Sequence, residues 1–186
     1  MLYQNNVIPL EGDIKTPNIR NPYTITEKAD GLRKLLFINK QGKVYLIDTN
    51  MRVQFTGIKT LKKIYFNTIL DGEHVLHDKK KIFINNYLAF DVYYINKKDI
   101  RSSAFYKQTD DGTIGRLVEL NKIINNIDFE PFVGDILPLK VKAKDFHYSD
   151  SETDNIFVNC RTILERVDEG QYEYETDGLI FTPADT

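Results

Sequence analysis

The first half of the chain is a series of short apolar runs, rich in β-branched and aromatic residues and separated by Asn, Asp, Lys and Gly. Such runs are typical of strands joined by tight turns. The predicted strands are Tyr23–Glu27, Leu35–Ile38, Val44–Ile47, Arg52–Phe55, Glu73–Leu76, Lys81–Ile84 and Tyr87–Ile95. A short helical turn is expected over Lys59–Tyr65, and the lysines at 79–81 are expected in the exposed turn of a hairpin. This half of the chain is therefore predicted to form an antiparallel meander.

The second half is predicted to add two helices. Leucines and isoleucines recur at helical spacing from Gly115 to Ile127. A second helix is expected to begin at a capping pair, Ser151 and Asp154, and to end at Gly170. Its buried face is predicted to carry Ile156, Phe157, Cys160, Ile163, Leu164 and Val167.

Two further segments have strand patterns. Apolar and charged residues alternate over Leu139–Phe146, which predicts a half-exposed strand, and Gly178–Thr182 predicts the last strand. No internal repeat and no linker rich in Gly, Ser or Pro divides the sequence. Residues 1–186 are therefore expected to form a single α+β domain, with helices packed on an antiparallel sheet.

Composition and charge exclude several classes of protein. Hydrophobic residues make up 41% and charged residues 28% of the 186 residues, which is a globular composition. No apolar run is long enough to span a membrane as a helix, and the N-terminus lacks the layout of a signal peptide. The net charge of -2 argues against a surface that is basic throughout. We expect a soluble intracellular protein with no membrane partner.

A compact motif follows the first predicted strand, and three further segments follow it. The residues are Lys28-Ala29-Asp30-Gly31-Leu32-Arg33, then Asp71-Gly72-Glu73, Leu88-Ala89-Phe90-Asp91 and Asp177-Gly178-Leu179-Ile180-Phe181. The first is the pattern of a lysine that attacks a phosphate. With a reference pKa of about 10.4, only about 0.04% of a lysine is neutral at pH 7. We expect Arg33 and a divalent metal ion on the substrate phosphates to lower the pKa of Lys28 and activate it.

The alternation of side chains along a strand predicts which face of the sheet each remaining candidate residue points to. Asp71 and Glu73 are two positions apart, so both point to one face, where two carboxylates can bind a hard metal ion or a ribose hydroxyl. The alternative for this pair is a turn aspartate beside a surface glutamate. Phe90 and Asp91 are adjacent and should point to opposite faces unless a bulge intervenes.

With these four segments in this order, the chain resembles the covalent nucleotidyltransferase superfamily, which comprises mRNA capping guanylyltransferases and ATP-dependent DNA and RNA ligases. Thr26–Arg33 and Thr176–Pro183 are similar to the capping forms of the first and fourth motifs. Tyr87–Asn96, followed by Lys98–Arg101, is similar to the capping enzymes of nucleocytoplasmic giant DNA viruses. The resemblance covers Tyr23–Pro183 and implies an antiparallel nucleotidyltransferase core of the ATP-grasp-like, DNA ligase-like adenylation type, with packed helices.

The resemblance also implies a role for each candidate. Lys28 would be the nucleophile of an mRNA guanylyltransferase, taking GMP from GTP and passing it to the 5′ diphosphate end of RNA. Arg33 would contact ribose hydroxyls or phosphate, and Phe90 would stack on the purine. The implied nucleotide-binding residues are Arg33, Glu73, Phe90 and Asp91, and the implied ligands of Mg²⁺ or Mn²⁺ are Asp177 and Glu73.

One part of the family pattern is missing. A fifth motif with two lysines that contact the α-phosphate normally follows the fourth, and an OB-fold domain comes after it. This chain has no Lys or Arg after Arg166, and its last twenty residues hold six acids. We therefore expect a fragment truncated after the fourth motif, with the missing part supplied by a longer chain or by other capping domains or subunits. Full activity is expected only with that part, and a viral protein of this kind would act in the host cytoplasm, in the virus factory, or in the virion.

Two other functions stay open at this point. A polynucleotide ligase would adenylate the same lysine from ATP. A non-catalytic nucleotide-binding or scaffold module would account for the missing fifth motif.

Overall fold

The computed structural model describes residues 22–106, 114–149 and 156–185 as two antiparallel sheets with a helix on each. The strands are β1 Tyr23–Ala29, β2 Leu32–Ile38, β3 Lys43–Asp48, β4 Val53–Lys59, β5 Thr68–His77, β6 Phe83–Ile95, β7 Lys98–Asp99, β8 Glu130–Pro131, β9 Lys140–Ala143, β10 His147–Ser149 and β11 Thr176–Pro183. The helices are α1 Arg116–Asn126 and α2 Ile156–Asp168, with a short 3₁₀ turn at Lys63–Tyr65. The predicted α+β class is confirmed.

The large sheet has the strand order β7-β6-β5-β2-β3-β4-β8, and β9 pairs with β6 in parallel. Alternate residues of β2, β3 and β5, such as Leu36, Leu46 and Leu70, point to one face and are buried there. Helix α1 covers this face with Leu117, Leu120 and Ile123. The main hydrophobic core therefore lies between α1 and one face of the large sheet.

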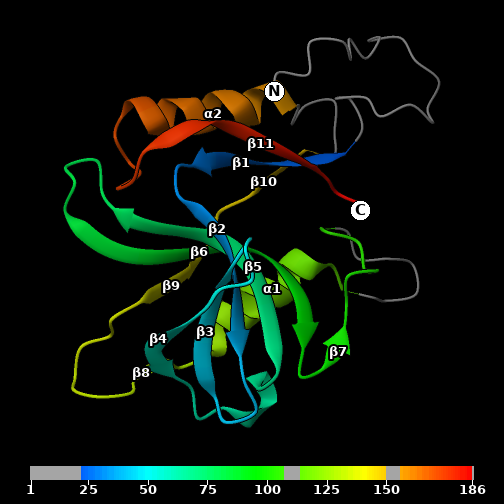
Figure 1. The fold of residues 1–186 in the computed structure, drawn as a ribbon. Coiled ribbons are helices and arrows are strands. Elements are labelled where there is room, and N and C mark those ends of the chain that lie inside the picture. Colours follow the sequence, from blue (N-terminus) through cyan, green and yellow to red (C-terminus); the bar gives the residue numbers. More distant parts are fainter. Residues whose placement is uncertain (1–21, 107–113, 150–155, 186) are drawn as a thin grey trace.

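The small sheet has the order β10-β1-β11, and α2 packs on β1 and β10. Ile25 of β1 is buried with Ile156 and Ile163 of α2. Figure 1 shows α2 and the small sheet at one end of the molecule and the large sheet with α1 at the other. The chain crosses between the sheets at Asp30 and Gly31, which begin two residues after Lys28.

The crossing requires glycine at position 31. A Cβ atom there would lie 2.8 Å from the carbonyl oxygen of His74 and 2.9 Å from Cγ of Glu73, both on β5. The absence of a Cβ atom therefore allows a close backbone approach, which brings the start of β2 against the strand that carries Glu73.

Two strand predictions differ from the structure. The runs predicted as separate strands over 81–84 and 87–95 form one strand, β6, which pairs with β5 through several register shifts. Asn85 adopts a φ of 48° within it, in the left-handed region that asparagine tolerates better than most residues. The predicted hairpin turn is confirmed, and the Asp78 carboxylate accepts hydrogen bonds from the amides of Lys80 and Ile82.

The predicted buried face of α2 is correct only in part. Ile156 and Ile163 are buried, whereas Phe157 is 62% and Leu164 is 47% exposed, because the three-stranded sheet below α2 covers a narrow face. Asn159 is buried in their place and donates to the carbonyl of Tyr148. The capping pair expected at positions 151 and 154 lies outside the described residues.

Within the described ranges, no helix has the length and apolar character that a membrane crossing requires.

Candidate active site

Lys28 lies at an irregularity in the pairing of β1 with β11. Glu27 pairs with Leu179 and Ala29 pairs with Thr176, so the register shifts at Lys28. Bulges of this kind re-aim a side chain and are frequent beside active sites. Gly178, on the opposite strand, adopts a φ of 94°, a conformation open mainly to glycine. The local backbone thus depends on the Asp-Gly dipeptide of the fourth segment.

The Lys28 side chain pairs with Asp177 across this bulge. Lys28 Nζ donates to Oδ2 of Asp177 at 2.5 Å, and both side chains are exposed, by 48% and 77%. The residues come from opposite ends of the described chain, and the β1–β11 pairing alone brings them together. The structure therefore places the candidate nucleophile and the candidate metal ligand in direct contact.

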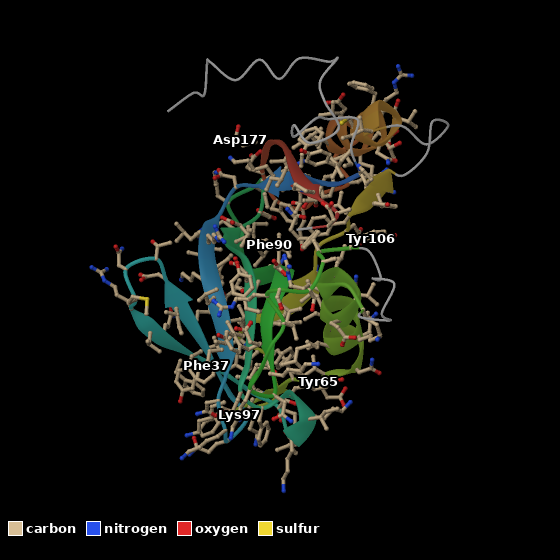
Figure 2. All side chains as sticks on the ribbon, turned by 90° about the vertical axis from the view of Figure 1, so that its right-hand side faces the viewer. Phe37, Tyr65, Phe90, Lys97, Tyr106 and Asp177 are labelled. Atoms are coloured by element: carbon tan, nitrogen blue, oxygen red, sulfur yellow. The ribbon has the colours of Figure 1, made fainter. Side chains whose placement is uncertain are left out.

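A pocket of about 150 Å³ opens beside Lys28, between the two sheets. It is lined by Lys28, Ala29, Asp30, Gly31, Glu73, Phe90, Lys144 and Ile180. Five separate parts of the chain contribute, namely the four sequence segments and Lys144. In Figure 2, Asp177 lies on the small sheet and Phe90 lies below it, at the end of the large sheet that faces the small one. The aromatic ring of Phe90 and the aliphatic side chain of Ile180 give the pocket apolar walls from both sheets.

Arg33 lies next to this pocket but is held by Asp71. Its Nη2 donates to Oδ2 of Asp71 at 2.6 Å, and the Asp71 side chain is fully buried. The Tyr93 hydroxyl donates to the same carboxylate at 2.5 Å, and desolvation followed by this contact raises the pKa of Tyr93 to about 12. The Arg33 guanidinium lies 5.8 Å from the centre of the Phe90 ring. Asp71 therefore orients a cation beside the aromatic wall, a role that the sequence prediction did not assign to it.

The electrostatic environment of Lys28 differs from the expected one. The hydrogen bond to Asp177 raises the pKa of Lys28, and the charges of Asp30 and Glu73 act in the same direction. The same pairing lowers the pKa of Asp177. Arg33 was expected to lower the pKa of Lys28, but its charge is paired with Asp71. Lys28 is thus an ammonium ion here, and its activation requires a change in the carboxylates around it.

Glu73 faces Arg33 across the β2–β5 pairing and lines the pocket. Desolvation is the largest influence on Glu73 and raises its pKa, although the charges of Lys144, Arg33 and Lys28 oppose it. A carboxylate that is partly desolvated beside three cations is suited to accept a hydrogen bond from a ligand hydroxyl or to bind a cation.

Asp91 lies apart from the pocket, and its role in nucleotide binding stays a prediction. It was predicted among the nucleotide-binding residues, but its carboxylate accepts from Nε of Arg116 at 2.9 Å, at the start of α1, and it does not line the pocket. Phe90 lines the pocket, and the β5–β6 pairing shifts register at this residue, between Ala89 and Asp91. The structure therefore gives Asp91 a role in attaching α1 to the large sheet.

Lys144 is a pocket residue that the sequence prediction missed. Its ammonium group contacts Oε1 of Glu27 at 3.2 Å, and only 5% of the residue is exposed. Burial lowers the pKa of Lys144, with Glu27 opposing the shift. The alternation over 139–146 predicted a half-exposed strand with its charged residues outward, but β9 ends at Ala143 and Lys144 is buried. No local pattern marks this burial, because the partner carboxylate is far away in sequence and comes from β1.

The carboxylates of the site suit a metal ion that arrives with a phosphate ligand. No group of three or more His, Cys, Asp or Glu side chains within the described ranges could hold a metal ion alone. Magnesium is commonly held by one or two carboxylates together with substrate phosphates. Asp177 and Glu73, whose charges both act on Lys28, provide that number of carboxylates.

A family model and two individual proteins match most of the chain, and all three are described as mRNA-capping enzymes. A family model described as "mRNA capping enzyme, catalytic domain" matches residues 13–186. A probable mRNA-capping enzyme of Acanthamoeba polyphaga mimivirus is 29% identical over 170 residues, which are 89% of this chain and 14% of that protein. An mRNA-capping enzyme of Danio rerio is 28% identical over 175 residues, covering 88% of this chain and 27% of that protein. The chain thus spans a minor part of the relatives it matches.

Solved structures identify the fold. A mycobacterial DNA ligase D complexed with ATP and MES has a TM-score of 0.53 and 16% identity, over 89% of this chain and 49% of that one. The ligase domain from M. tuberculosis LigD has a TM-score of 0.55 and 15% identity, over 89% of this chain and 48% of that one. These likenesses, together with the two-sheet architecture, confirm the predicted DNA ligase-like nucleotidyltransferase fold.

Proposed function

The chain belongs to the mRNA capping enzyme catalytic domain family, and on this premise we propose that it is the core of an mRNA guanylyltransferase. In the proposed reaction, Lys28 takes GMP from GTP and the GMP is then transferred to the 5′ diphosphate end of RNA. The observation that carries the proposal is the pocket in which Lys28, Glu73 and Phe90 converge from three distant segments.

The first half of the reaction uses Lys28 as a nucleophile. Neutral Lys28 Nζ forms a bond to the α-phosphorus of GTP, and the bond from that phosphorus to the pyrophosphate oxygen breaks. The product is lysyl-GMP, and the proton lost from the ammonium group passes to solvent or to a neighbouring carboxylate. In the second half, a terminal phosphate oxygen of the RNA attacks the same phosphorus and Lys28 leaves.

Asp177 controls the state of the nucleophile. As long as its carboxylate is free to accept the hydrogen bond from Lys28, the ammonium form is favoured. Asp177 and Glu73 would hold a divalent cation delivered with the nucleotide. When bound, Mg²⁺ or Mn²⁺ supplies positive charge at the phosphates. Occupation of the Asp177 carboxylate by such a cation would release Lys28 and lower its pKa.

The other pocket residues bind the nucleoside. Phe90 stacks on the guanine, a contact worth about 1 to 3 kcal/mol for a base on an aromatic ring. Arg33, positioned by Asp71 and Tyr93, contacts the ribose or a phosphate. We also propose that further domains or subunits of a capping apparatus contribute cations to the phosphates, since only Lys28 and Lys144 provide cations among the described pocket-lining residues.

Covalent labelling tests the proposal. A form of the protein that contains its remainder is incubated with Mg²⁺ or Mn²⁺ and either GTP or ATP labelled at the α-phosphate, and the protein is analysed after denaturation. We expect label from GTP in the wild type and none in Lys28→Arg, which keeps the positive charge beside Asp177 but does not act as the nucleophile. Preferential label from ATP would instead indicate a ligase. GTP binding without an adduct, in a form that contains the remainder of the protein, would indicate a non-catalytic module.

A further inference from the structure

The face of the large sheet opposite α1 is not covered by either helix. Side chains alternate along β2, so Leu36 and Ile38 enter the core below α1 while Arg33, Leu35 and Phe37 point to the other face. Figure 2 shows α1 on one side of this sheet, and Phe37 lies toward the end remote from Phe90 and Asp177. This outer face therefore begins at the candidate active site and extends away from it.

An aromatic and basic cluster lies at the far end of this outer face. We call it the Phe132 platform, and it consists of Lys43, Tyr45, Phe55, Lys59 and Phe132. The Phe55 ring centre is 5.4 Å from those of both Tyr45 and Phe132. Phe55 is 40% and Phe132 is 44% exposed. The rings form a continuous aromatic surface on three neighbouring segments, β3, β4 and the residue after β8.

Two lysines converge on this aromatic surface. Nζ of Lys43 is 4.9 Å and Nζ of Lys59 is 6.0 Å from the centre of the Phe132 ring. Lys43 and Lys59 are also direct cross-strand partners on β3 and β4. Like charges in directly opposed positions destabilise a sheet. Glu130 offsets this only weakly, since its carboxylate is 3.9 Å from Lys59 and is 46% exposed. An anion between the two ammonium groups would remove the repulsion.

We propose that the Phe132 platform binds the RNA acceptor as a single strand, downstream of the 5′ end that reaches Lys28. The proposal rests on the proposed function, which requires an RNA acceptor but does not say where its chain lies. Phosphates contact Lys43 and Lys59, and a base stacks on the exposed Phe55 ring. Aromatic rings interleaved with cations are the usual means by which a protein holds single-stranded nucleic acid without reading its sequence.

The distance from the site to the platform sets a minimum length for the RNA. Phe37 is four positions after Arg33 along β2, and β4 lies two strands from β2. With a rise of about 3.3 Å per residue and a strand spacing of about 4.8 Å, the separation is about 16 Å. At a stacked rise of about 3.4 Å per nucleotide, about five nucleotides cover that distance. A dinucleotide should therefore reach Lys28 but not the platform.

Binding of fluorescein-labelled 5′-diphosphate RNA, followed by anisotropy across a salt series, tests the proposal. The probes are an RNA of about twelve nucleotides, well above the required length, and a dinucleotide. We expect Phe55→Leu, which keeps an apolar side chain, to weaken binding of the longer RNA about 5- to 150-fold, the range for loss of one base stack. Lys43→Gln with Lys59→Gln should reduce the salt slope by about 1.4, since each phosphate contact on a single strand contributes about 0.7.

Matched controls come from the β5–β6 hairpin at a different edge of the molecule. Phe83 is 64% exposed, and Lys80 and Lys81 are exposed lysines of the turn. Phe83→Leu and the double variant Lys80→Gln, Lys81→Gln make the same chemical changes and should leave RNA binding unchanged. The proposal would be overturned if the platform and hairpin variants lost RNA affinity equally. It would also be overturned if only the hairpin variants lost RNA affinity.

The test is independent of the first half-reaction. Formation of lysyl-GMP needs no RNA, so platform variants should be labelled by GTP as well as the wild type. Failure of the wild type to form lysyl-GMP would contradict the proposed function. The anisotropy assay would still show whether RNA binding depends on the platform residues. The platform would be contradicted if the wild type bound the longer RNA no more tightly than the dinucleotide. If Phe55→Leu changed the self-association of the protein, the platform would instead be an interface between copies of the chain.

Discussion

At the scale of single residues, the contact between Lys28 and Asp177 determines how the nucleophile behaves. Sequence reasoning identified both residues and correctly expected them to share a site, because their segments resemble the first and fourth motifs of one family. It expected a lowered lysine pKa, whereas the hydrogen bond to Asp177 raises it. The difference arises because Lys28 pairs with Asp177 through the β1–β11 register, whereas Arg33 pairs with Asp71 through the β2–β5 register. No local pattern reveals either register.

Substitution of Asp177 tests this contact. Because the carboxylate stabilises the ammonium form, Asp177→Asn should lower the pKa of Lys28 toward or below the reference value of about 10.4. A pH titration of labelled lysine side chains by NMR, without nucleotide, measures the shift. Asp30→Asn is the matched control, since Asp30 contributes a smaller part of the same effect. An unchanged Lys28 pKa in Asp177→Asn would show that the two side chains do not pair in solution.

Asp91 provides a second test at this scale. Its carboxylate is paired with Arg116, and both side chains are almost fully buried. Asp91→Ala would leave the guanidinium without this partner, and removal of one member of a buried pair typically destabilises a protein by about 3 to 5 kcal/mol. Urea unfolding measures this loss, and we expect GTP affinity under conditions where the variant is folded to change less than about twofold. Lost GTP affinity at unchanged stability would restore Asp91 as a nucleotide ligand.

At the scale of elements, the junction of β1 and β2 fixes the position of the nucleophile relative to Glu73. The pattern of apolar runs predicted most strands and both helices, because apolar residues recur at the strand or helix period along the buried face of each. It did not predict that β6 is continuous or that Lys144 turns inward to Glu27. These features depend on bulges and on partners that are distant in sequence, so hydrophobic periodicity cannot predict them.

Gly31→Ala tests the importance of the junction. The added Cβ would lie within 3 Å of both the His74 carbonyl and Glu73 Cγ, so β2 and β5 must move apart. We expect a loss of stability of about 1 to 3 kcal/mol, as for other overpacked positions. Thermal and urea unfolding measure it. Gly134→Ala is the reference, because no atom lies within 4 Å of its added Cβ and only the backbone conformation is penalised. A smaller loss at Gly31 than at Gly134 would contradict the close approach.

At the scale of the whole molecule, the two sheets meet at one pocket while the outer face of the large sheet leads away from it. The sequence resemblance correctly indicated the family and the ligase-like core. It could not indicate the Phe132 platform, whose members belong to no motif and are brought together by the pairing of β3, β4 and β8. Chemistry and acceptor binding thus occupy two ends of one surface in this proposal.

The central claim is that Lys28 carries the transferred nucleotide, and peptide mass spectrometry tests it most directly. A wild-type form of the protein that contains its remainder is incubated with Mg²⁺ and an equal mixture of GTP and ATP, and it is digested under conditions that preserve a phosphoramidate. We expect the peptide containing Lys28 to gain one GMP moiety, bound through Nζ, with no adduct in Lys28→Arg. An adduct on another residue, or AMP in place of GMP on Lys28, would contradict the claim.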